Sequence, residues 1–359
     1  MQVELVPPHY KMWEYEKTLQ HKEIENLFGK KIVRKKNKQI LEINGNKNDS
    51  LSRLTFYHYY NYNNHKITTW QKLLETEQKS LRKNSKYVTH GIHLYKGKFY
   101  PQLVKSLLNI SRVKKNSIFL DPYCGSGTSM LEGYLNGMKS FGCDLNPLAI
   151  LISKTKLNVL QVSPVELVKT IKKITDLKYL AKETRGIEYF PSYCRDEILR
   201  WFPLTVIKKI AYLKESIDQI DNPEMRNFFL VILSGIIRRV SQQDQSDLRI
   251  RYRKVFLKNA PVFSLFKSSL KQNEKKILHF HKIKSFSNVK FQNSEIWLGD
   301  NTKFDCFNKK LQKNVDVIIT SPPYATALPY IDTDRLSLLS ILGLPSKKRR
   351  KTEFVLTGS

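Results

Sequence analysis

The sequence predicts an α/β fold in which a doubly wound parallel sheet carries a mainly helical insertion, and three observations support this. A short apolar strand at 117–120 runs into a Gly-rich turn and a helix, and a second short strand follows at 140–143. Apolar residues recur at helical spacing between about 164 and 284. The apolar run 315–319 then returns the chain to the sheet. Strands that alternate with helices in this way form βαβ units, which build parallel sheets.

Changes in composition divide the chain of 359 residues into four segments. Residues 1–85 form an accessory N-terminal region with polar Lys- and Asn-rich runs. Residues 86–160 and 289–359 supply the two halves of the α/β domain, and residues 161–288 form the helical insertion between them.

Two features of the N-terminal region predict local structure. Thr68 and Gln71 have the spacing of a capping box, which predicts a helix over about 70–83. The aromatic cluster at 56–60 could offer stacking faces to bases, but such residues more often pack a local core. We therefore interpret the cluster as packing.

The composition points to a partner and to a compartment. A formal net charge of +30 favours a polyanion, with nucleic acid first, although a chain that is Lys-rich throughout could carry such charge without a binding role. The four cysteines form no C-x-x-C pair, so neither a disulfide framework nor a metal site is expected, and a reducing cytoplasm fits best. Neither a signal peptide nor an apolar run of membrane-spanning length is found, so we expect no membrane partner.

The strongest local pattern is the turn Asp121-Pro122-Tyr123-Cys124-Gly125-Ser126-Gly127-Thr128 between the first strand and its helix. Its small residues allow a ligand to approach the backbone, and Asp144 closes the next strand, where a carboxylate can bind ribose hydroxyls. A dinucleotide site would place a third glycine where Met130 stands and would disfavour Asp121 beside a pyrophosphate. A cationic sulfonium cofactor is favoured by that carboxylate. The pattern therefore predicts S-adenosylmethionine rather than NAD.

A second pattern, Thr320-Ser321-Pro322-Pro323-Tyr324, follows the apolar run 315–319. Together with the Asp-Pro-x-x-Gly-x-Gly-Thr turn, this resembles the amino-methyltransferases that modify exocyclic nitrogens of DNA bases. The resemblance covers residues 90–150 and 290–340 and implies a Rossmann-like class I methyltransferase fold. A cysteine nucleophile for methylation at a ring carbon is not indicated, because Cys124 lies inside the cofactor turn.

The resemblance also implies roles for individual residues. In the tetrapeptide, the Ser321 side chain and the Pro322 carbonyl would accept the amino hydrogens, Pro323 would stiffen the turn, and Tyr324 would stack on the flipped base. Phe99, in a segment that resembles the cover of the methionine end, is equally open to plain core packing. Asp300 follows the apolar stretch 296–298 and would approach the adenine amino group, although a Gly-Asp pair alone is a turn. The cofactor-binding set is Phe99, Asp121, Tyr123, Gly125, Gly127, Thr128, Asp144 and Asp300.

The insertion contains a stretch, 238–254, that combines arginines with amide side chains. Arginine suits phosphates and glutamine suits base edges, and target recognition in the resembled family would fall in this insertion. The other interpretation is a solvated basic loop. The candidate DNA-binding residues are Arg238, Arg239, Gln242, Gln243, Arg249, Arg251 and Arg253.

The residues after Tyr324 have room for one helix, at 334–342, followed by the basic run 347–351. The sheet of the resembled family continues past the catalytic strand, so we expect a fragment or a split enzyme completed by a second polypeptide.

We expect methyl transfer to N4 of cytosine in double-stranded DNA, because Ser321 is less usual in adenine enzymes. The resemblance implies a bacterial or phage restriction-modification or other defence setting. A cognate restriction nuclease is a candidate partner that the sequence leaves open. N6 of adenine, RNA methylation and a noncatalytic DNA-binding partner subunit stay open as alternatives.

Overall fold

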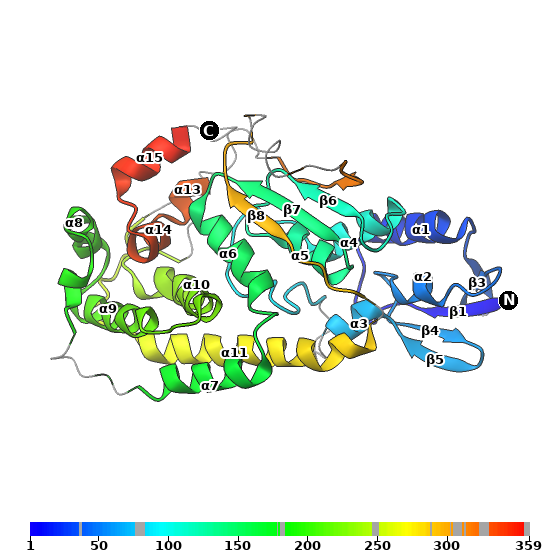
Figure 1. The fold of residues 1–359 in the computed structure, drawn as a ribbon, viewed down its shortest axis with the longest axis horizontal. Coiled ribbons are helices and arrows are strands. Elements are labelled where there is room, and N and C mark those ends of the chain that lie inside the picture. Colours follow the sequence, from blue (N-terminus) through cyan, green and yellow to red (C-terminus); the bar gives the residue numbers. More distant parts are fainter. Residues whose placement is uncertain are drawn as a thin grey trace.

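The computed structural model describes residues 1–35, 38–75, 83–177, 179, 184–245, 251–287, 289–301, 303, 311, 314–322 and 330–354. The molecule is elongated, with an N-terminal sheet at one end, a second sheet in the middle and a group of helices at the other end (Figure 1).

The N-terminal region forms an antiparallel sheet. Its strands β1 (Gln2–Val6), β2 (Val33–Lys35), β3 (Lys38–Glu42), β4 (Tyr59–Tyr62) and β5 (His65–Thr68) lie in the order β2-β3-β1-β4-β5, with helices α1 (Glu14–Phe28) and α2 (Asn48–Ser52). The β4–β5 hairpin turns through Asn63 and Asn64, which both have positive φ, a conformation that asparagine tolerates. Tyr57 and Tyr60 are fully buried in the core of this region, so the packing interpretation of the aromatic cluster is confirmed.

The predicted capping box is wrong by one residue. Helix α3 (Trp70–Leu74) is capped by Thr69, whose side chain accepts from the Lys72 N–H. Thr68 is held extended, because it pairs with Tyr59 in the β4–β5 ladder. The amide of Gln71 donates to Glu75 instead of capping the helix. Of the rest of the expected helix, residues 76–82 lie outside the described part of the chain.

The central sheet confirms the predicted parallel α/β fold. Within the described residues its strands are β6 (Ile118–Asp121), β7 (Lys139–Asp144), β8 (Glu295–Leu298) and β9 (Val317–Ile318), all parallel and in the order β8-β7-β6-β9. Helices α4 (Pro101–Ile110), α5 (Thr128–Leu135) and α6 (Pro147–Asn158) precede or follow its first two strands. The chain moves from β6 to β7 on one side and later to β9 on the other, which creates a switch point, and ligands of such sheets bind at the carboxyl ends of the strands there.

The insertion is helical, as predicted. Its elements are α7 (Pro164–Thr175), the 3-10 turn η1 (Gly186–Tyr189), α8 (Ser192–Trp201), α9 (Leu204–Asp218), α10 (Pro223–Val240), α11 (Val262–Ile283) and the 3-10 turn η2 (Lys284–Phe286). The apolar stretch 201–217, read from the sequence as one stretch, is divided because α8 ends at Trp201 and Pro203 precedes α9.

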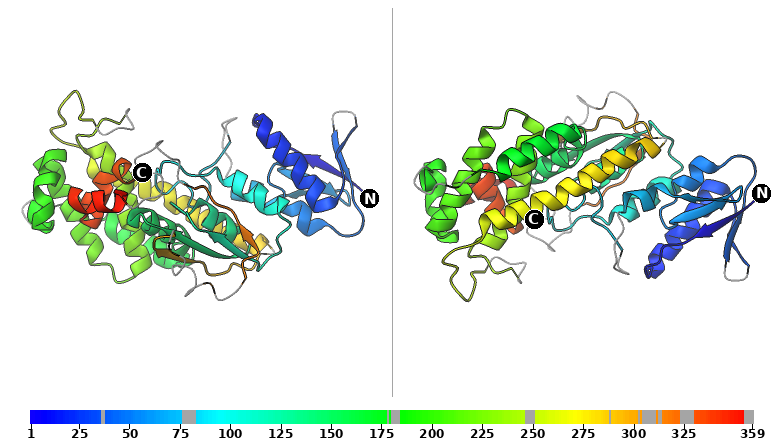
Figure 2. Two further views of the ribbon diagram at one scale, coloured as in Figure 1. Left: turned by 90° about the horizontal axis from the view of Figure 1, so that it is seen from above. Right: turned by 90° about the horizontal axis from the view of Figure 1, so that it is seen from below.

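The insertion shares its core with the central sheet. Helix α10 packs against α6, α9 and α11, and the same core cluster contains Phe119 of β6 and Ile296 of β8. Seen from below, α11 crosses the middle of the molecule toward the N-terminal region (Figure 2), and His279 of α11 bonds through Nε2 to the Leu73 carbonyl at 2.8 Å. The insertion is therefore firmly packed on the domain that it interrupts.

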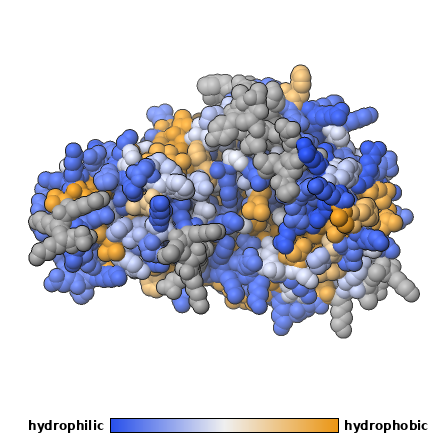
Figure 3. Space-filling view, turned by 180° about the vertical axis from the view of Figure 1, so that it is seen from behind, coloured by the Kyte–Doolittle hydropathy of each residue, from blue (hydrophilic) through white to orange (hydrophobic). Residues whose placement is uncertain are grey.

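The last described residues contain more helix than the sequence predicts. Helix α14 (Arg335–Leu342) matches the expected helix, but α13 (Tyr330–Thr333) precedes it and the basic run forms part of α15 (Ser346–Phe354). The expectation of a single helix is wrong because α15 depends on a tertiary contact, in which buried Arg349 pairs with Glu197 of α8 at 2.5 Å. In the described part of the chain, every helix is too short or too polar to cross a bilayer. The face seen from behind is largely hydrophilic (Figure 3).

Candidate functional site

The carboxyl ends of β6 and β9 are joined by a buried carboxylate. Asp121 ends β6, and its Oδ1 accepts from the Tyr123 N–H at 3.1 Å and from the Thr320 hydroxyl at 2.7 Å, while Ser129 donates to its Oδ2. Burial raises the pKa of Asp121 to about 6, although the hydrogen bonds from Ser129 and Thr320 lower it. Ser321 follows directly, so the two sequence motifs meet at the switch point. Of the tetrapeptide, Ser321 and Pro322 are described, and Pro323 and Tyr324 lie outside the described residues.

The Gly-rich turn adopts a backbone that only small residues allow. Gly125 and Gly127 have φ of 49° and 74°. A methyl group on Gly127 would lie 2.1 Å from the hydroxyl oxygen and 3.0 Å from the Cα of Ser153 on α6, so the turn is pressed against that helix. The buried hydroxyl of Thr128, at the start of α5, has no hydrogen-bond partner among the described residues.

Asp144 connects this turn to Tyr95 through Asn146. It ends β7, and its two carboxylate oxygens accept from the Gly125 N–H at 2.9 Å and the Asn146 N–H at 2.8 Å. Burial raises its pKa. Asn146 caps α6 and donates its amide to the Tyr95 hydroxyl at 3.2 Å. A carboxylate that accepts one hydrogen bond per oxygen keeps lone pairs for further donors.

Lys156 supports the Gly-rich turn through a hydrogen bond to its backbone. No sequence motif marks this lysine as part of the site. Its side chain is fully buried on α6, and its Nζ donates to the Ser126 carbonyl at 2.6 Å. Burial lowers its pKa well below the ordinary value, and the nearby Lys98 lowers it further. Among the described residues no carboxylate lies within ion-pair distance of Lys156. A buried amine thus holds the backbone of the Gly-rich turn.

The other predicted cofactor residues lie at or near the same edge. The Gly299 N–H bonds to the Asp144 carbonyl at 3.1 Å, which brings Asp300 to the end of the neighbouring strand, and Lys303 lies 3.8 Å from its carboxylate. Tyr123 is partly exposed beside the turn. Phe99 is partly buried and packs against the main core.

A pocket of about 290 Å³ adjoins the covering segment. It is bordered by His93–Lys96, by the end of α10 and by the start of α14. Tyr95 lines it, and so does Asp334, whose pKa burial raises to about 7 although Arg238 and Lys96 act in the opposite direction. Burial also lowers the pKa of His93 to about 4, so this imidazole is neutral at pH 7. Tyr95 and Asp334 were missed because single tyrosine and aspartate residues carry no motif.

The loop after α10 is tightly bonded to itself. The amide of Gln242 donates to the Leu257 carbonyl at 2.8 Å and accepts from its N–H at 3.0 Å, and Gln243 is buried in a backbone bridge with Tyr252. Arg253 donates to the Ser241 carbonyl at 2.8 Å. The side chains of Gln242 and Arg253 therefore hold the loop together, which corrects the expectation that Gln242 faces base edges. The side chain of Gln243 instead lines the pocket that contains Tyr95 and Asp334.

The arginines of this loop differ in exposure. Arg238 donates to the Asp244 carbonyl at 3.2 Å and is partly buried, whereas Arg239 and Arg251 are exposed. Arg249 lies outside the described residues. Arg239 and Arg251 are thus the predicted DNA-binding side chains that the fold presents to solvent.

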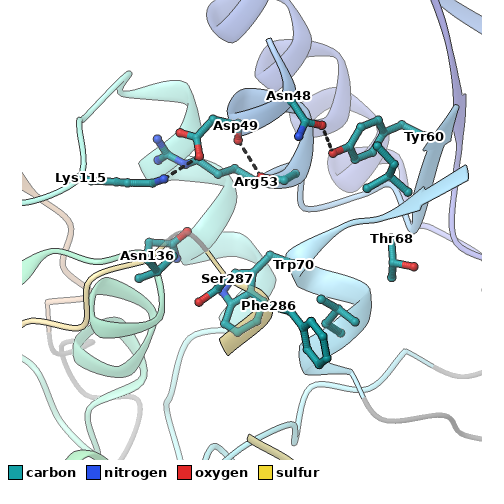
Figure 4. A pocket seen from close by; sticks show the side chains of 14 residues that line it. Asn48, Asp49, Arg53, Tyr60, Thr68, Trp70, Lys115, Asn136, Phe286 and Ser287 are labelled. Atoms are coloured by element: carbon teal, nitrogen blue, oxygen red, sulfur yellow. Dashed lines mark hydrogen bonds and ion pairs between the residues drawn. The ribbon is translucent and has the colours of Figure 1, made fainter. Parts of the chain in front are cut away.

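A smaller pocket of about 140 Å³ lies between the N-terminal sheet and the central domain (Figure 4). Asp49 of α2 pairs with Lys115 across it at 2.6 Å, and Tyr60 donates to Asn48 on the same side. Trp70 and Phe286 add apolar surface. None of the predicted site residues lines this pocket.

Comparisons with known proteins relate this geometry to a family. A DNA methylase family model of the N6/N4 type matches residues 4–155. The Type II methyltransferase M.MvaI of Kocuria varians is 28% identical over 274 residues, 72% of this chain and 58% of that protein. The Type II methyltransferase M.BsoBI of Geobacillus stearothermophilus is 24% identical over 299 residues, 76% of this chain and 56% of that protein.

A tRNA (guanine(10)-N2)-dimethyltransferase of Methanocaldococcus jannaschii is 33% identical over 88 residues, which are 24% of each chain. The chain spans little more than half the length of the two type II relatives.

Proposed function

We propose that this chain, whose residues 4–155 match a DNA methylase family model of the N6/N4 type, transfers a methyl group from S-adenosylmethionine to the N4 amino group of cytosine in double-stranded DNA. The observation that carries this proposal is the hydrogen bond of 2.7 Å between Thr320 and Asp121. It holds the start of the Ser-Pro-Pro-Tyr segment against the cofactor turn, so that a bound methyl donor and a bound amine would meet there.

The residues present fit S-adenosylmethionine. When bound, this cofactor would supply an electrophilic methyl group on a sulfonium centre. The carboxylates of Asp121 and Asp144 supply negative charge toward a cationic ligand, and Asp144 keeps lone pairs for ribose hydroxyls. The unpartnered hydroxyl of Thr128 is a further polar group at the turn. Asp300 would bind the adenine amino group, and Tyr123 and Phe99 would flank the cofactor.

The tetrapeptide would act on the amine. An exocyclic amine conjugated to its ring is a poor nucleophile, and acceptors aimed at its hydrogens favour the geometry in which nitrogen attacks the methyl group. The hydroxyl of Ser321 and the carbonyl of Pro322 would be those acceptors, with Pro323 and Tyr324 completing the segment. We propose that the extruded base reaches them through the pocket lined by Tyr95 and Asp334.

The DNA backbone would lie along the insertion. Arg239 and Arg251 are exposed at the loop after α10, and exposed arginines bind phosphates by charge and by hydrogen bonds. Since two relatives are named as type II methyltransferases, we also propose that a restriction nuclease of the same specificity accompanies this protein.

The test is methyl transfer from radiolabelled S-adenosylmethionine to unmethylated DNA, with the methylated bases separated and identified by mass. We expect label on N4 of cytosine, and its loss in Ser321→Ala and Tyr324→Ala with cofactor binding retained. Label on N6 of adenine would support a DNA amino-methyltransferase but overturn the assignment of cytosine as the target base. Absence of both label and cofactor binding would overturn the proposal in favour of a noncatalytic DNA-binding partner.

A second candidate substrate has one observation in its favour. The relative from Methanocaldococcus jannaschii is named as a tRNA methyltransferase and matches 24% of this chain. The same assay with tRNA in place of DNA separates the two, because label on tRNA alone would assign RNA as the substrate.

A further inference from the structure

A groove of about 780 Å³ lies beyond the start of α14, at the end of the molecule opposite the N-terminal sheet. It is bordered by α8, by Tyr252 of the loop after α10, and by the C-terminal helices α13 to α15. The arginine-rich loop and the basic run 347–351 are thus brought to one groove although they lie far apart in the sequence.

The groove contains an aromatic ring that is both exposed and fixed. Tyr252 stacks on Trp201 with ring centroids 4.2 Å apart and planes inclined by 2°. Trp201 is buried, and the Arg335 guanidinium lies 4.4 Å from its ring centroid, whereas Tyr252 is 55% exposed. A ring that is held by its neighbours loses little conformational freedom when a planar ligand stacks on it.

The backbone of Tyr252 is fixed as well. Residues 243 and 252 form an antiparallel bridge, the Arg251 carbonyl accepts from the Asp244 N–H at 2.8 Å, and the Arg253 N–H donates to the Gln242 carbonyl at 2.8 Å. The side-chain bonds of Gln242 and Arg253 described above brace the same loop. The loop therefore presents Tyr252 in a defined position.

Cations line the same groove. Arg200, Lys347 and Arg350 line the groove and are exposed, and Lys348 lies 4.9 Å from the ring centroid of Tyr193, which is itself 59% exposed.

Acidic residues also line the groove, but two of them are engaged. Glu197 pairs with Arg349 at 2.5 Å, and Asp332 lies 3.7 Å from Arg335, which leaves Asp196 and Glu353 as the remaining acids. Aromatic faces interleaved with cations are the pattern that binds unpaired nucleic acid, because bases stack on the rings and phosphates bind the cations.

We propose that this groove binds an unpaired base of DNA, which stacks on Tyr252 while Arg200, Lys347 and Arg350 hold its flanking phosphates. Inside a duplex both faces of a base are covered by its neighbours, so only a displaced base can stack on a side chain. The inference rests on the proposed function for the identity of the nucleic acid. The groove would hold a base displaced beside the target.

The experiment compares two DNA probes that differ in one unpaired base. One is a short fully paired duplex, and the other is the same duplex with a single bulged 2-aminopurine, an adenine analogue whose fluorescence falls when it stacks. Stacking tolerates any base, so no recognition sequence is needed. We expect the full chain to bind the bulged probe about tenfold more tightly and to quench its fluorescence.

Variants of the stacked ring identify the contact. Tyr252→Leu should abolish both the preference and the quenching, Tyr252→Phe should retain both, and Tyr15→Leu, which alters an exposed tyrosine on α1, should behave as the wild type. Circular dichroism checks that each variant is folded. Retention of preference and quenching in Tyr252→Leu overturns the proposal. So does an equal loss of affinity for both probes, which would indicate contact with the backbone only.

Further controls separate this proposal from the proposed function. A chain that stacks the bulged base but neither transfers a methyl group nor binds S-adenosylmethionine would overturn the proposed function and leave the groove assignment standing. A stronger preference for single-stranded RNA than for the bulged DNA would overturn the DNA assignment of the groove.

Discussion

The Nζ of Lys156 donates to the carbonyl of Ser126 at 2.6 Å, so a fully buried lysine of α6 fixes the turn that follows the first strand of the central sheet. Gly127 is pressed against Ser153, one turn earlier on the same helix. Helix α6 thus contacts the Gly-rich turn at two adjacent points.

Replacing Lys156 by methionine should separate cofactor affinity from stability. The variant keeps the apolar stem but releases the Ser126 carbonyl, and the loss of one hydrogen bond that orders a binding loop should weaken S-adenosylmethionine about tenfold. Because burial lowers the pKa of Lys156, the folded chain holds fewer protons than the unfolded chain between the two pKa values.

Between the folded-state and unfolded-state pKa values of Lys156, the free energy of unfolding of the wild type should therefore rise with pH relative to that of Lys156→Met. Calorimetric titration and thermal unfolding at several pH values measure the two effects, and unchanged cofactor affinity would contradict the positioning role.

Gly127→Ala should be much more disruptive than Gly45→Ala. Both glycines have positive φ, but no atom lies within 4 Å of a methyl group placed on Gly45, whereas one on Gly127 meets the backbone of Ser153. Gly45→Ala should cost about 1–2 kcal/mol from backbone strain alone. Gly127→Ala should cost roughly 2–5 kcal/mol because overpacking is added. Chemical denaturation of both variants measures the difference. Equal losses of unfolding free energy would show that α6 moves away to accommodate the added methyl group.

Binding of S-adenosylmethionine should weaken in acid. Burial raises the pKa of Asp121 to about 6, so the carboxylate is ionised above that pH and gains a proton below it. A cationic ligand prefers the ionised form, and affinity should fall up to tenfold per pH unit below about pH 6.

Thr320→Val is the matched variant for this effect. It removes a hydrogen bond that lowers the pKa of Asp121, so the decline should begin at a higher pH. Titrations from pH 5 to 8 test both statements, and identical profiles for wild type and variant would refute the assignment to Asp121.

Arginines of the loop after α10 should divide into two classes. Arg239→Ala and Arg251→Ala should each weaken DNA binding and lower the salt dependence of log K by about one unit, and Arg239→Ala should leave thermal stability unchanged. Arg253→Ala should instead lower the unfolding temperature, because Arg253 donates to the carbonyls of Arg239 and Ser241. Fluorescence anisotropy over a range of salt concentrations, with a melting curve for each variant, distinguishes the classes.

The sequence by itself determined the parallel sheet, the Gly-rich turn after its first strand and the helical insertion. Strand, glycine turn and helix follow one another at 118–135, and positive φ at Gly125 and Gly127 is a local requirement that the residue type reveals. The helical spacing of apolar residues is equally local, so the sequence predicted helices in the region of α10 and α11. The antiparallel N-terminal sheet was not predicted, because its order β2-β3-β1-β4-β5 depends on pairing between distant segments.

Only the tertiary structure decided which polar groups meet. It joined Asp121 to Thr320 across 199 residues of chain and turned Gln242 inward onto its own loop. It also brought Tyr252 to the groove that the C-terminal helices line. The physical reason is that a local pattern records which face of an element is apolar, whereas the partner of a buried polar group is set by packing between elements.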